Sequence, residues 1–226
     1  MHDDLSFHSP SGSNASSIRM LLENAGVMPA ELSADISKIE EPLRNTLEQI
    51  SFQAWPKNRP NGVVLVGTTG VGKTYGMAAL AKHQLQKKYA TGIPAHFDNA
   101  FPPAIWKSAL DLVSEWRSMA LHPSDQERLF RRLAQADFLF LDDLGGETKE
   151  RGGREYDRGI SFIDRLIRAR YDHFRPTSCT TNCTAEALIL RYGAPFFSRL
   201  QHMSMWIEFP KGSRDRRLRG RLSMQG

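Results

Sequence analysis

A glycine-rich segment that ends in a lysine and a hydroxyl residue is the strongest chemical signal in the sequence. It matches the spacing GxxxxGK[ST] in full, with the residues Gly67, Thr68, Thr69, Gly70, Val71, Gly72, Lys73 and Thr74. Glycines let the backbone turn its N–H groups towards a phosphate. The lysine supplies a positive charge for the β- and γ-phosphates, and the threonine hydroxyl can coordinate Mg²⁺. The segment therefore predicts a binding loop for ATP and Mg²⁺.

Two adjacent carboxylates, Asp142 and Asp143, directly follow an apolar run at 138–141. Ligands of open α/β sheets lie at the carboxyl ends of the strands, so a strand beside the phosphate loop would bring both side chains to the nucleotide. We then expect Asp142 to hold the Mg²⁺ and Asp143 to orient or deprotonate the attacking water. Adjacent aspartates can also simply open a loop, and that alternative stays open.

The elements that must position these residues alternate between strands and helices. Apolar runs predict strands at 63–66 and 138–141, and strands are also expected at 177–181 and 205–209, with a further candidate at 93–97. Helical spacing of apolar residues predicts helices over 73–89, 102–121, 125–136 and 159–174. The alternation is typical of an α/β protein whose mostly parallel central sheet is flanked by helices.

The N-terminal part is expected to form a separate extension. Residues 1–45 are predicted to be partly disordered and partly helical, and residues 46–226 to form the ATPase domain with a basic C-terminal tail. The serine-rich stretch 1–17 has little to bury, which favours disorder there. Helices are expected at 17–25, 29–39 and 41–55. Packing and partner docking are both compatible with such an extension.

Composition sets broader limits. The chain has 226 residues, 40% of them hydrophobic, and a net charge of +5. No apolar run approaches the ~18 residues of a membrane span, and the N-terminus lacks a secretory signal, so we expect a cytoplasmic protein without a membrane partner. The two cysteines, Cys179 and Cys183, are interpreted as reduced strand residues. Basic residues crowd the tail and favour either a solvated surface or a nucleic-acid contact; they are Lys211, Arg214, Arg216, Arg217, Arg219 and Arg221.

The order of four motifs resembles that of the AAA+ ATPases of the DnaC/IstB group, which are bacterial and phage replicative helicase loaders and transposition helper ATPases. The motifs are the phosphate loop, the run LDDLGGE at 141–147, the helix-to-strand passage from 167 to Asn182 with its Arg170–Tyr171 pair, and Ser-Arg-Leu at 198–200. The resemblance covers roughly residues 45–215 and implies a P-loop NTPase fold of the AAA+ type that hydrolyses ATP.

The resemblance also implies roles for two further residues. Asn182 matches the sensor that hydrogen-bonds the γ-phosphate or the lytic water. Arg199 matches the arginine finger that reaches the ATP of a neighbouring subunit, where a guanidinium stabilises charge on the transferring phosphoryl group. The alternatives are a turn or cap at Asn182 and a surface ion pair at Arg199. The implied catalytic set is Lys73, Asp143, Asn182 and Arg199, with Thr74 and Asp142 at the metal.

The sequence departs from the group's pattern in three places. Many AAA+ proteins have Asp-Glu where this chain has Asp142 and Asp143, so the water must lie closer or hydrolysis is slow. A full C-terminal helical lid is not expected, and Arg216 or Arg217 is only a candidate second sensor. The charged, glycine-rich stretch 145–158, which includes Glu147, is interpreted as a loop that either faces DNA or the centre of an oligomer, or is simply solvated.

Taken with the resemblance, these features lead to one main hypothesis. The chain is expected to be an ATP-dependent DNA replication factor that oligomerises on single-stranded DNA, with ATP at subunit interfaces, and delivers or remodels a replicative helicase. One alternative is a transposition helper that binds duplex DNA and recruits a transposase. Another is an ATP-sensing adaptor with little turnover.

Overall fold

The computed structural model describes residues 12–39, 41, 43–49, 62–89, 102–147 and 154–209. In chain order the elements are α1 (Gly12–Ala25), the 3₁₀ turn η1 (Ile36–Lys38), α2 (Leu43–Gln49), β1 (Gly62–Val66), α3 (Lys73–Lys88), β2 (Ala104–Ser108), α4 (Ala109–Ser118), α5 (Pro123–Gln135), β3 (Phe138–Leu144), α6 (Arg154–Asp172), β4 (Thr177–Thr181), α7 (Ala185–Tyr192), α8 (Ala194–Met203) and β5 (Ser204–Glu208).

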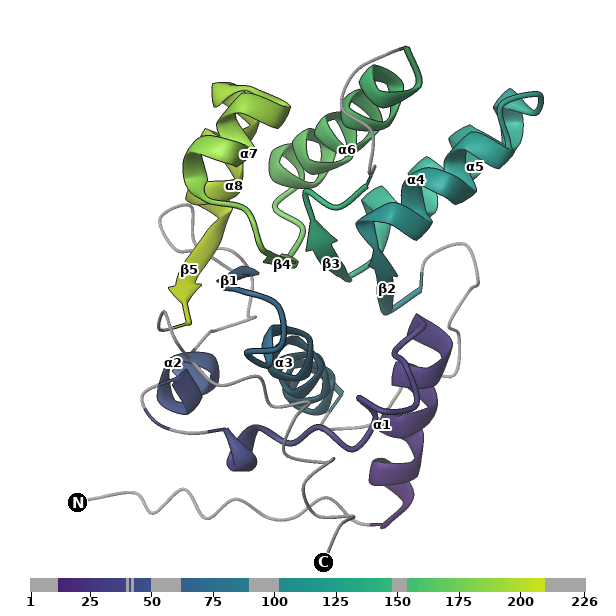
Figure 1. Ribbon diagram of the computed structural model, residues 1–226. Coiled ribbons are helices and arrows are strands. Elements are labelled where there is room, and N and C mark those ends of the chain that lie inside the picture. The colour runs from purple at the N-terminus through teal and green to yellow at the C-terminus, as the bar shows by residue number, and fades with distance from the viewer. Residues whose placement is uncertain are drawn as a thin grey trace, which may run out of the picture.

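The described strands form one parallel five-stranded sheet with the order β2–β3–β4–β1–β5. Helices α1, α2 and α3 cover one face of the sheet, and helices α4 to α8 cover the other (Figure 1). The carboxyl ends of β1, β3 and β4 therefore meet at one edge, which is where parallel α/β sheets bind ligands. The predicted α/β fold with a parallel central sheet is confirmed.

The apolar runs form strands because each strand is buried on both sides. Along β1, Val63 and Leu65 pack into the cluster that contains α3, whereas Val64 packs into the cluster that contains α6 and α8. All three side chains have no exposed surface. Apolar residues suit a strand that is buried on both faces, which explains a continuous run where a half-exposed strand would alternate.

The helix predicted over 102–121 is partly wrong, because its first part is strand β2. Trp106 lies in this strand, where it is buried and stacks on Phe140 of β3 with ring centroids 5.9 Å apart. Helix α4 starts only after Ser108, whose side chain caps it by accepting a hydrogen bond from the N–H of Asp111. Periodicity alone does not separate a short buried strand from a buried helical turn, and pairing with β3 decides for the strand.

Other expectations also need correction. Helix α1 begins at Gly12, inside the stretch predicted to be disordered, and residues 29–39 contain turns and η1 where a helix was predicted. Helices α7 and α8 were not predicted at all. Cys183 lies after β4, outside the strand.

The N-terminal elements belong to the same packed layer as α3. Ile18 and Leu22 of α1 and Leu47 of α2 are buried in the cluster that also contains Leu80 of α3. The predicted domain boundary at residue 45 falls inside α2. Partner docking by this part of the chain stays a prediction.

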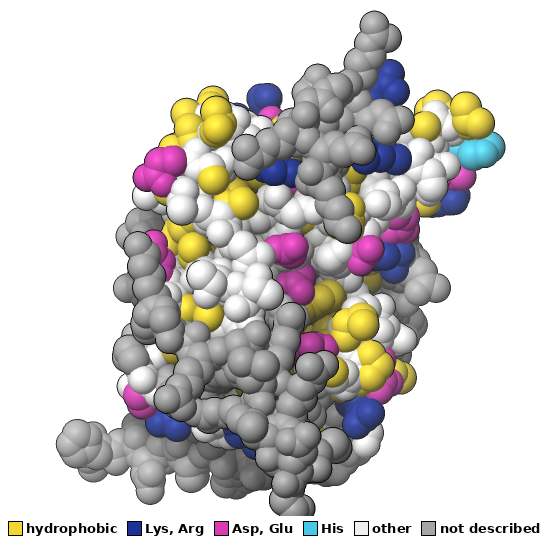
Figure 2. Space-filling model, in the orientation of Figure 1, with side chains coloured by type: hydrophobic (Ala, Val, Ile, Leu, Met, Phe, Trp, Pro, Cys, Tyr) yellow, Lys and Arg dark blue, Asp and Glu magenta, His cyan; other side chains and the backbone are white. Residues whose placement is uncertain are grey.

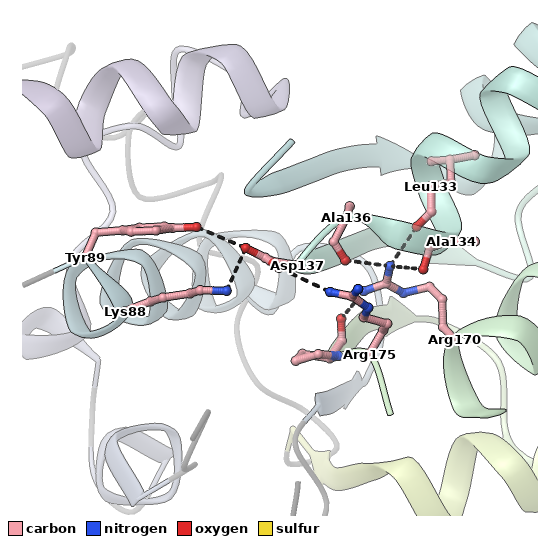
Figure 3. A network of polar contacts seen from close by, with 9 residues as sticks. Lys88, Tyr89, Leu133, Ala134, Ala136, Asp137, Arg170 and Arg175 are labelled. Atoms are coloured by element: carbon pink, nitrogen blue, oxygen red, sulfur yellow. Dashed lines mark hydrogen bonds and ion pairs between the residues drawn. The ribbon is translucent and has the colours of Figure 1, made fainter. Parts of the chain in front are cut away.

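One buried cation, Arg170, connects elements at the amino end of strand β4, opposite to the phosphate loop. Arg170 of α6 has no exposed surface. Its guanidinium donates to the carbonyls of Leu133 (2.6 Å) and Ala136 (3.0 Å) at the end of α5, to the carbonyl of Pro176 (2.6 Å) and to Oγ1 of Thr177 (2.8 Å), as Figure 3 shows in part. Burial lowers the pKa of Arg170 to about 9, so the group stays charged at neutral pH. Arg170 thus fixes the end of α5 to the start of β4.

Several predictions concern residues outside this part of the chain. They are the strand at 93–97, the centre of the charged loop at 148–153, the basic tail with its candidate sensor arginines, and the expected lack of a C-terminal lid. None of the helices in the described ranges combines the length and apolar character that a membrane crossing requires.

Candidate functional site

The phosphate loop lies between the end of β1 and the start of α3. Gly70 and Gly72 have φ values of 86° and 102°, in the left-handed region that glycine adopts without steric cost. Gly72 caps α3, so the first N–H groups of this helix, which have no partner within the helix, face an anion site. The N–H of Gly67 donates to the carbonyl of Thr181 (3.2 Å), which holds the loop against β4. Phosphate binding by this segment stays a prediction that these backbone features support.

Lys73 lies buried at the base of this loop. Its Nζ donates to the carbonyls of Gly67 and Thr68, both at 2.8 Å, and to Oδ1 of Asn182 at 2.7 Å. All three partners are oxygen acceptors, which is also what a phosphate offers. The ammonium is therefore positioned where a bound triphosphate could exchange for part of these contacts.

Thr74 and Asp142 present oxygen atoms to one another across the site. Oγ1 of Thr74 lies 3.2 Å from both carboxylate oxygens of Asp142, and Oγ1 of Thr180 donates to Oδ1 of Asp142 at 2.5 Å. Burial raises the pKa of Asp142, while its hydrogen bonds from Thr180 and Thr74 act in the opposite direction. A hydroxyl beside a partly desolvated carboxylate is a hard oxygen donor set, so these residues fit Mg²⁺.

Asp143 is exposed at the point where the pairing of β3 with β4 shifts in register. Its φ of 55° is unusual for a non-glycine residue, and its N–H donates to Oγ1 of Thr180 (2.9 Å). Asn182 donates from Nδ2 to Oδ1 of Asp143 (2.7 Å) while its own Oδ1 accepts from Lys73. Asn182 therefore connects the cation of the phosphate loop to the carboxylate expected to act on water.

These side chains line one cleft of about 660 Å³. Figure 2 shows acidic side chains around a hollow near the middle of this face. Four residues of the lining were not predicted: Thr180 on β4, Tyr75 on α3, and Glu31 and Lys38 from the N-terminal segment. Of these four, only Thr180 could have been found from the sequence. It carries a hydroxyl two positions before Asn182, on a strand that was expected beside the phosphate loop.

Arg199 does not reach this cleft within one chain. It lies on α8, where Nη1 pairs with Oδ1 of Asp164 on α6 at 3.3 Å, and its side chain is 24% exposed. The single chain thus shows the surface ion pair that the sequence left as an alternative. Action on the nucleotide of a neighbouring copy stays a proposal.

The raised pKa of Asp142 leads to a stability prediction. Because the folded chain holds this proton more tightly than the unfolded chain, stability is lost as pH rises from the ordinary value of 3.8 through the folded pKa. Asp142→Asn is therefore expected to raise the melting temperature of the nucleotide-free protein at pH 7, by about 2–4 °C if the gain is about 1 kcal/mol.

Thermal unfolding followed by circular dichroism, with and without ATP and Mg²⁺, checks this expectation. The same variant should lose most of the stabilisation that ATP with Mg²⁺ gives to the unchanged protein. Asp143→Asn, which neutralises the exposed neighbouring carboxylate, is the matched control and should change the melting temperature less. A lower melting temperature for nucleotide-free Asp142→Asn would contradict a desolvated carboxylate at this position.

Comparison with solved structures gives AAA+ proteins of DNA replication. The DnaC helicase loader matches with a TM-score of 0.62 and 20% identity, covering 81% of this chain and 100% of that chain. DnaI matches with a TM-score of 0.61 and 21% identity, over 81% of this chain and 95% of that chain. A replication initiator DnaA bound to AMPPCP and single-stranded DNA matches with a TM-score of 0.61 and 15% identity, over 88% of this chain and 56% of that chain.

No protein-family model and no curated protein sequence matches the chain. At these low identities the solved structures establish the fold, which is that of AAA+ P-loop proteins. The resemblance to the DnaC/IstB group is confirmed at that level. The roles of individual residues stay proposals, because similarity of fold alone does not test them.

Proposed function

We propose that this chain, with the fold of AAA+ helicase loaders, is an ATPase of DNA replication that delivers or remodels a replicative helicase on single-stranded DNA. The observation that carries the proposal is the convergence of the phosphate loop with Asp142 and Asn182 in one cleft. Those residues come from three neighbouring strands of the sheet and match the chemistry of a nucleoside triphosphate.

The phosphate loop and its lysine account for nucleotide binding. The backbone of residues 67–74 would bind the phosphates, with Lys73 on the β- and γ-phosphates. Thr74 and Asp142 would hold the Mg²⁺, which when bound neutralises charge on the phosphate oxygens. The partial burial of Asp142 strengthens this electrostatic contact because the local dielectric is lower than in water.

Asp143 and Asn182 account for hydrolysis. The Asp143 carboxylate would orient the attacking water and accept its proton, and Asn182 would hold that carboxylate through the contact at 2.7 Å. Asp143 is one methylene shorter than the glutamate common in AAA+ proteins, so we expect slow basal turnover. An ATP-sensing adaptor is the limiting case, in which the cleft binds ATP and hardly hydrolyses it.

Arg199 would complete the site of a neighbouring copy. Its ion pair with Asp164 is partly exposed on both sides, and such pairs contribute only about 0–1 kcal/mol. Assembly could therefore release the guanidinium at little cost and bring it to the γ-phosphate of the next subunit. This proposal requires a homo-oligomer with ATP at the interfaces.

DNA is the partner that the chain's charge supports. The net charge of +5 favours a polyanion, and a solved neighbour is a DnaA initiator bound to single-stranded DNA. A transposition helper would instead prefer duplex DNA. Affinity for either should fall steeply with salt, because binding releases counterions from the phosphates.

Steady-state phosphate release tests the proposal directly. We expect slow release by the purified protein, stimulation by single-stranded DNA and weaker stimulation by duplex DNA. Equal or stronger stimulation by duplex DNA would favour the transposition helper. ATP binding without measurable turnover under any condition would favour the adaptor.

Arg199→Ala is expected to leave ATP binding by the monomer unchanged and to lower DNA-stimulated turnover by roughly 100-fold or more, since arginine fingers contribute strongly to phosphoryl transfer. Mixing it with Lys73→Ala protein should restore part of the activity, because one variant supplies the site and the other the finger. Arg168→Ala, on the exposed side of α6, is the matched control and should stay within about twofold of the unchanged protein. No recovery in the mixture would speak against action across subunits.

A further inference from the structure

Glu147 is a buried carboxylate that the proposed reaction does not use. The sequence places it in a charged loop, but its side chain is only 1% exposed. Oε1 accepts hydrogen bonds from the N–H of Gly145 (2.9 Å) and from the hydroxyl of Tyr192, and Oε2 pairs with Nε of Arg191 at 3.1 Å. Burying a carboxylate is costly unless it is paired and hydrogen-bonded, so these partners hold it in a defined place.

Glu147 lies close in sequence to Asp143, the carboxylate proposed to activate water. Glu147 closes a compact turn in which the N–H of Gly146 donates to the carbonyl of Asp143 (2.9 Å). A Cβ at Gly146 would lie 2.5 Å from Oδ2 of Asp143, and one at Gly145 would lie 2.5 Å from Sγ of Cys183. Because the turn has no spare room, the position of the Asp143 carboxylate depends on the path of the backbone that Glu147 fixes.

The side-chain partners of Glu147 lie on α7, which packs against α8, the helix that carries the proposed arginine finger Arg199. Arg191 and Tyr192 are the last residues of α7. The ring of Tyr192 stacks on Phe196 of α8, with centroids 4.3 Å apart and planes inclined by 21°. Phe196 precedes Arg199 by three residues on α8, so both lie within one turn of the same helix. Contacts therefore run without a gap from the Asp143 turn to the helix of Arg199.

We propose that Glu147 is a positioning residue that couples the two ends of the catalytic machinery, placing Asp143 for the chain's own nucleotide and Arg199 for the neighbour's. This inference rests on the proposed function. It assigns Glu147 no contact with the nucleotide, because Glu147 does not line the cleft that contains Lys73 and Asp142. Its loss should consequently affect turnover and spare binding.

Glu147→Gln is the first test, since it keeps the size and one acceptor oxygen but removes the charge that pairs with Arg191. We expect ATP affinity close to that of the unchanged protein, a lower melting temperature because the buried ion pair with Arg191 is broken, and a DNA-stimulated kcat about 10-fold lower, because a small misplacement of reacting groups can cost up to ~100-fold. Tyr192→Phe, a milder change at the same contact, should lower kcat in the same way. The double variant should be no worse than the poorer single variant.

Glu127→Gln is the matched control. It also removes an ion pair with an arginine, Arg165, at 3.0 Å, but the two side chains lie on α5 and α6 and are 45% exposed at Glu127 and 58% exposed at Arg165. We expect kcat within about twofold of the unchanged protein. If Glu147→Gln loses ATP affinity together with turnover, or if its kcat matches that of Glu127→Gln, the positioning role is wrong.

Mixed oligomers test separately whether Glu147 positions Asp143 and whether it positions Arg199. In a mixture of Arg199→Ala with Lys73→Ala protein, working sites join the nucleotide site of the first variant to the finger of the second. Adding Glu147→Gln to the Arg199→Ala protein probes the Asp143 end, and adding it to the Lys73→Ala protein probes the Arg199 end. Coupling predicts a severalfold loss in both mixtures relative to the parent mixture, and a loss in only one of them would overturn it.

The outcome also distinguishes this inference from the proposed function. If the unchanged protein hydrolyses ATP and Glu147→Gln equals it, only the positioning role of Glu147 fails. If the unchanged protein and Lys73→Ala protein are equally unable to bind and hydrolyse ATP, the assignment of the cleft fails, and the coupling through Glu147 fails with it.

Discussion

Lys73→Ala is expected to lower ATP affinity roughly 100-fold or more, about 3 kcal/mol, and to abolish measurable hydrolysis. The ammonium is buried and already surrounded by three oxygen acceptors at 2.7–2.8 Å. No other lysine or arginine of the described residues that line the cleft is buried, since Lys38 is exposed. Its loss removes the main positive charge for the β- and γ-phosphates in a site of reduced dielectric.

Binding of a fluorescent ATP analogue and phosphate release measure the two effects. The fold should persist, because the fold's apolar clusters do not include Lys73. Lys82→Ala is the matched control on the same helix, where Lys82 contacts the carbonyl of Ala34 and does not line the cleft. Its ATP affinity should stay within about twofold. Unchanged affinity of the Lys73→Ala protein would falsify the assignment of the phosphate loop.

Arg170→Ala is expected to have the largest effect on stability, a loss of about 3–5 kcal/mol. The substitution removes a fully buried cation together with its hydrogen bonds to three carbonyls and one hydroxyl. The carbonyls of Leu133 and Ala136 lie at the end of α5, where backbone acceptors have no partner within the helix. At the start of β4, Oγ1 of Thr177 loses its donor and the carbonyl of Pro176 keeps only the N–H of Leu139. Each buried acceptor without a donor costs about 1–3 kcal/mol.

Urea unfolding measures the loss. Since domains are stable by only about 5–15 kcal/mol, the alanine variant could be too unstable to purify, and Arg170→Lys then serves as the second variant. Lysine keeps the charge but offers three donors from one atom, so it should lose an intermediate amount. A midpoint unchanged in both variants would contradict the role of Arg170 as a clamp.

Arg175→Ala is the control for the Arg170 variants. Arg175 pairs with Asp137 at 3.2 Å in the same region, and Asp137 also contacts Lys88 and Tyr89 (Figure 3). The side chain of Arg175 is 38% exposed. An exposed ion pair of this kind contributes about 0.2–1 kcal/mol. The contrast between two neighbouring arginines would show that burial and the number of acceptors decide the effect, and that charge alone does not.

The phosphate loop, the buried strands β1 and β3 and the position of Asp142 are determined by local patterns in the sequence. The phosphate loop is predictable because its glycines, its lysine and its threonine act within eight consecutive positions, at 67–74. The strands β1 and β3 are predictable because each contains a continuous apolar run, which suits burial on both faces. The placement of Asp142 follows from the end of such a run, given that ligands bind at the carboxyl ends of parallel strands.

Contacts between distant parts of the chain are decided only by the tertiary structure. Asn182 reaches Lys73 across 109 positions, and Glu147 is buried only because α7 folds back onto the turn that follows Asp143. Residues 104–108 form a strand because β3 offers a partner, a choice that the apolar pattern leaves open. A charged side chain such as Glu147 is solvated or buried depending on which distant residues pack against it. The neighbouring residues in the sequence do not determine the free energy of that packing.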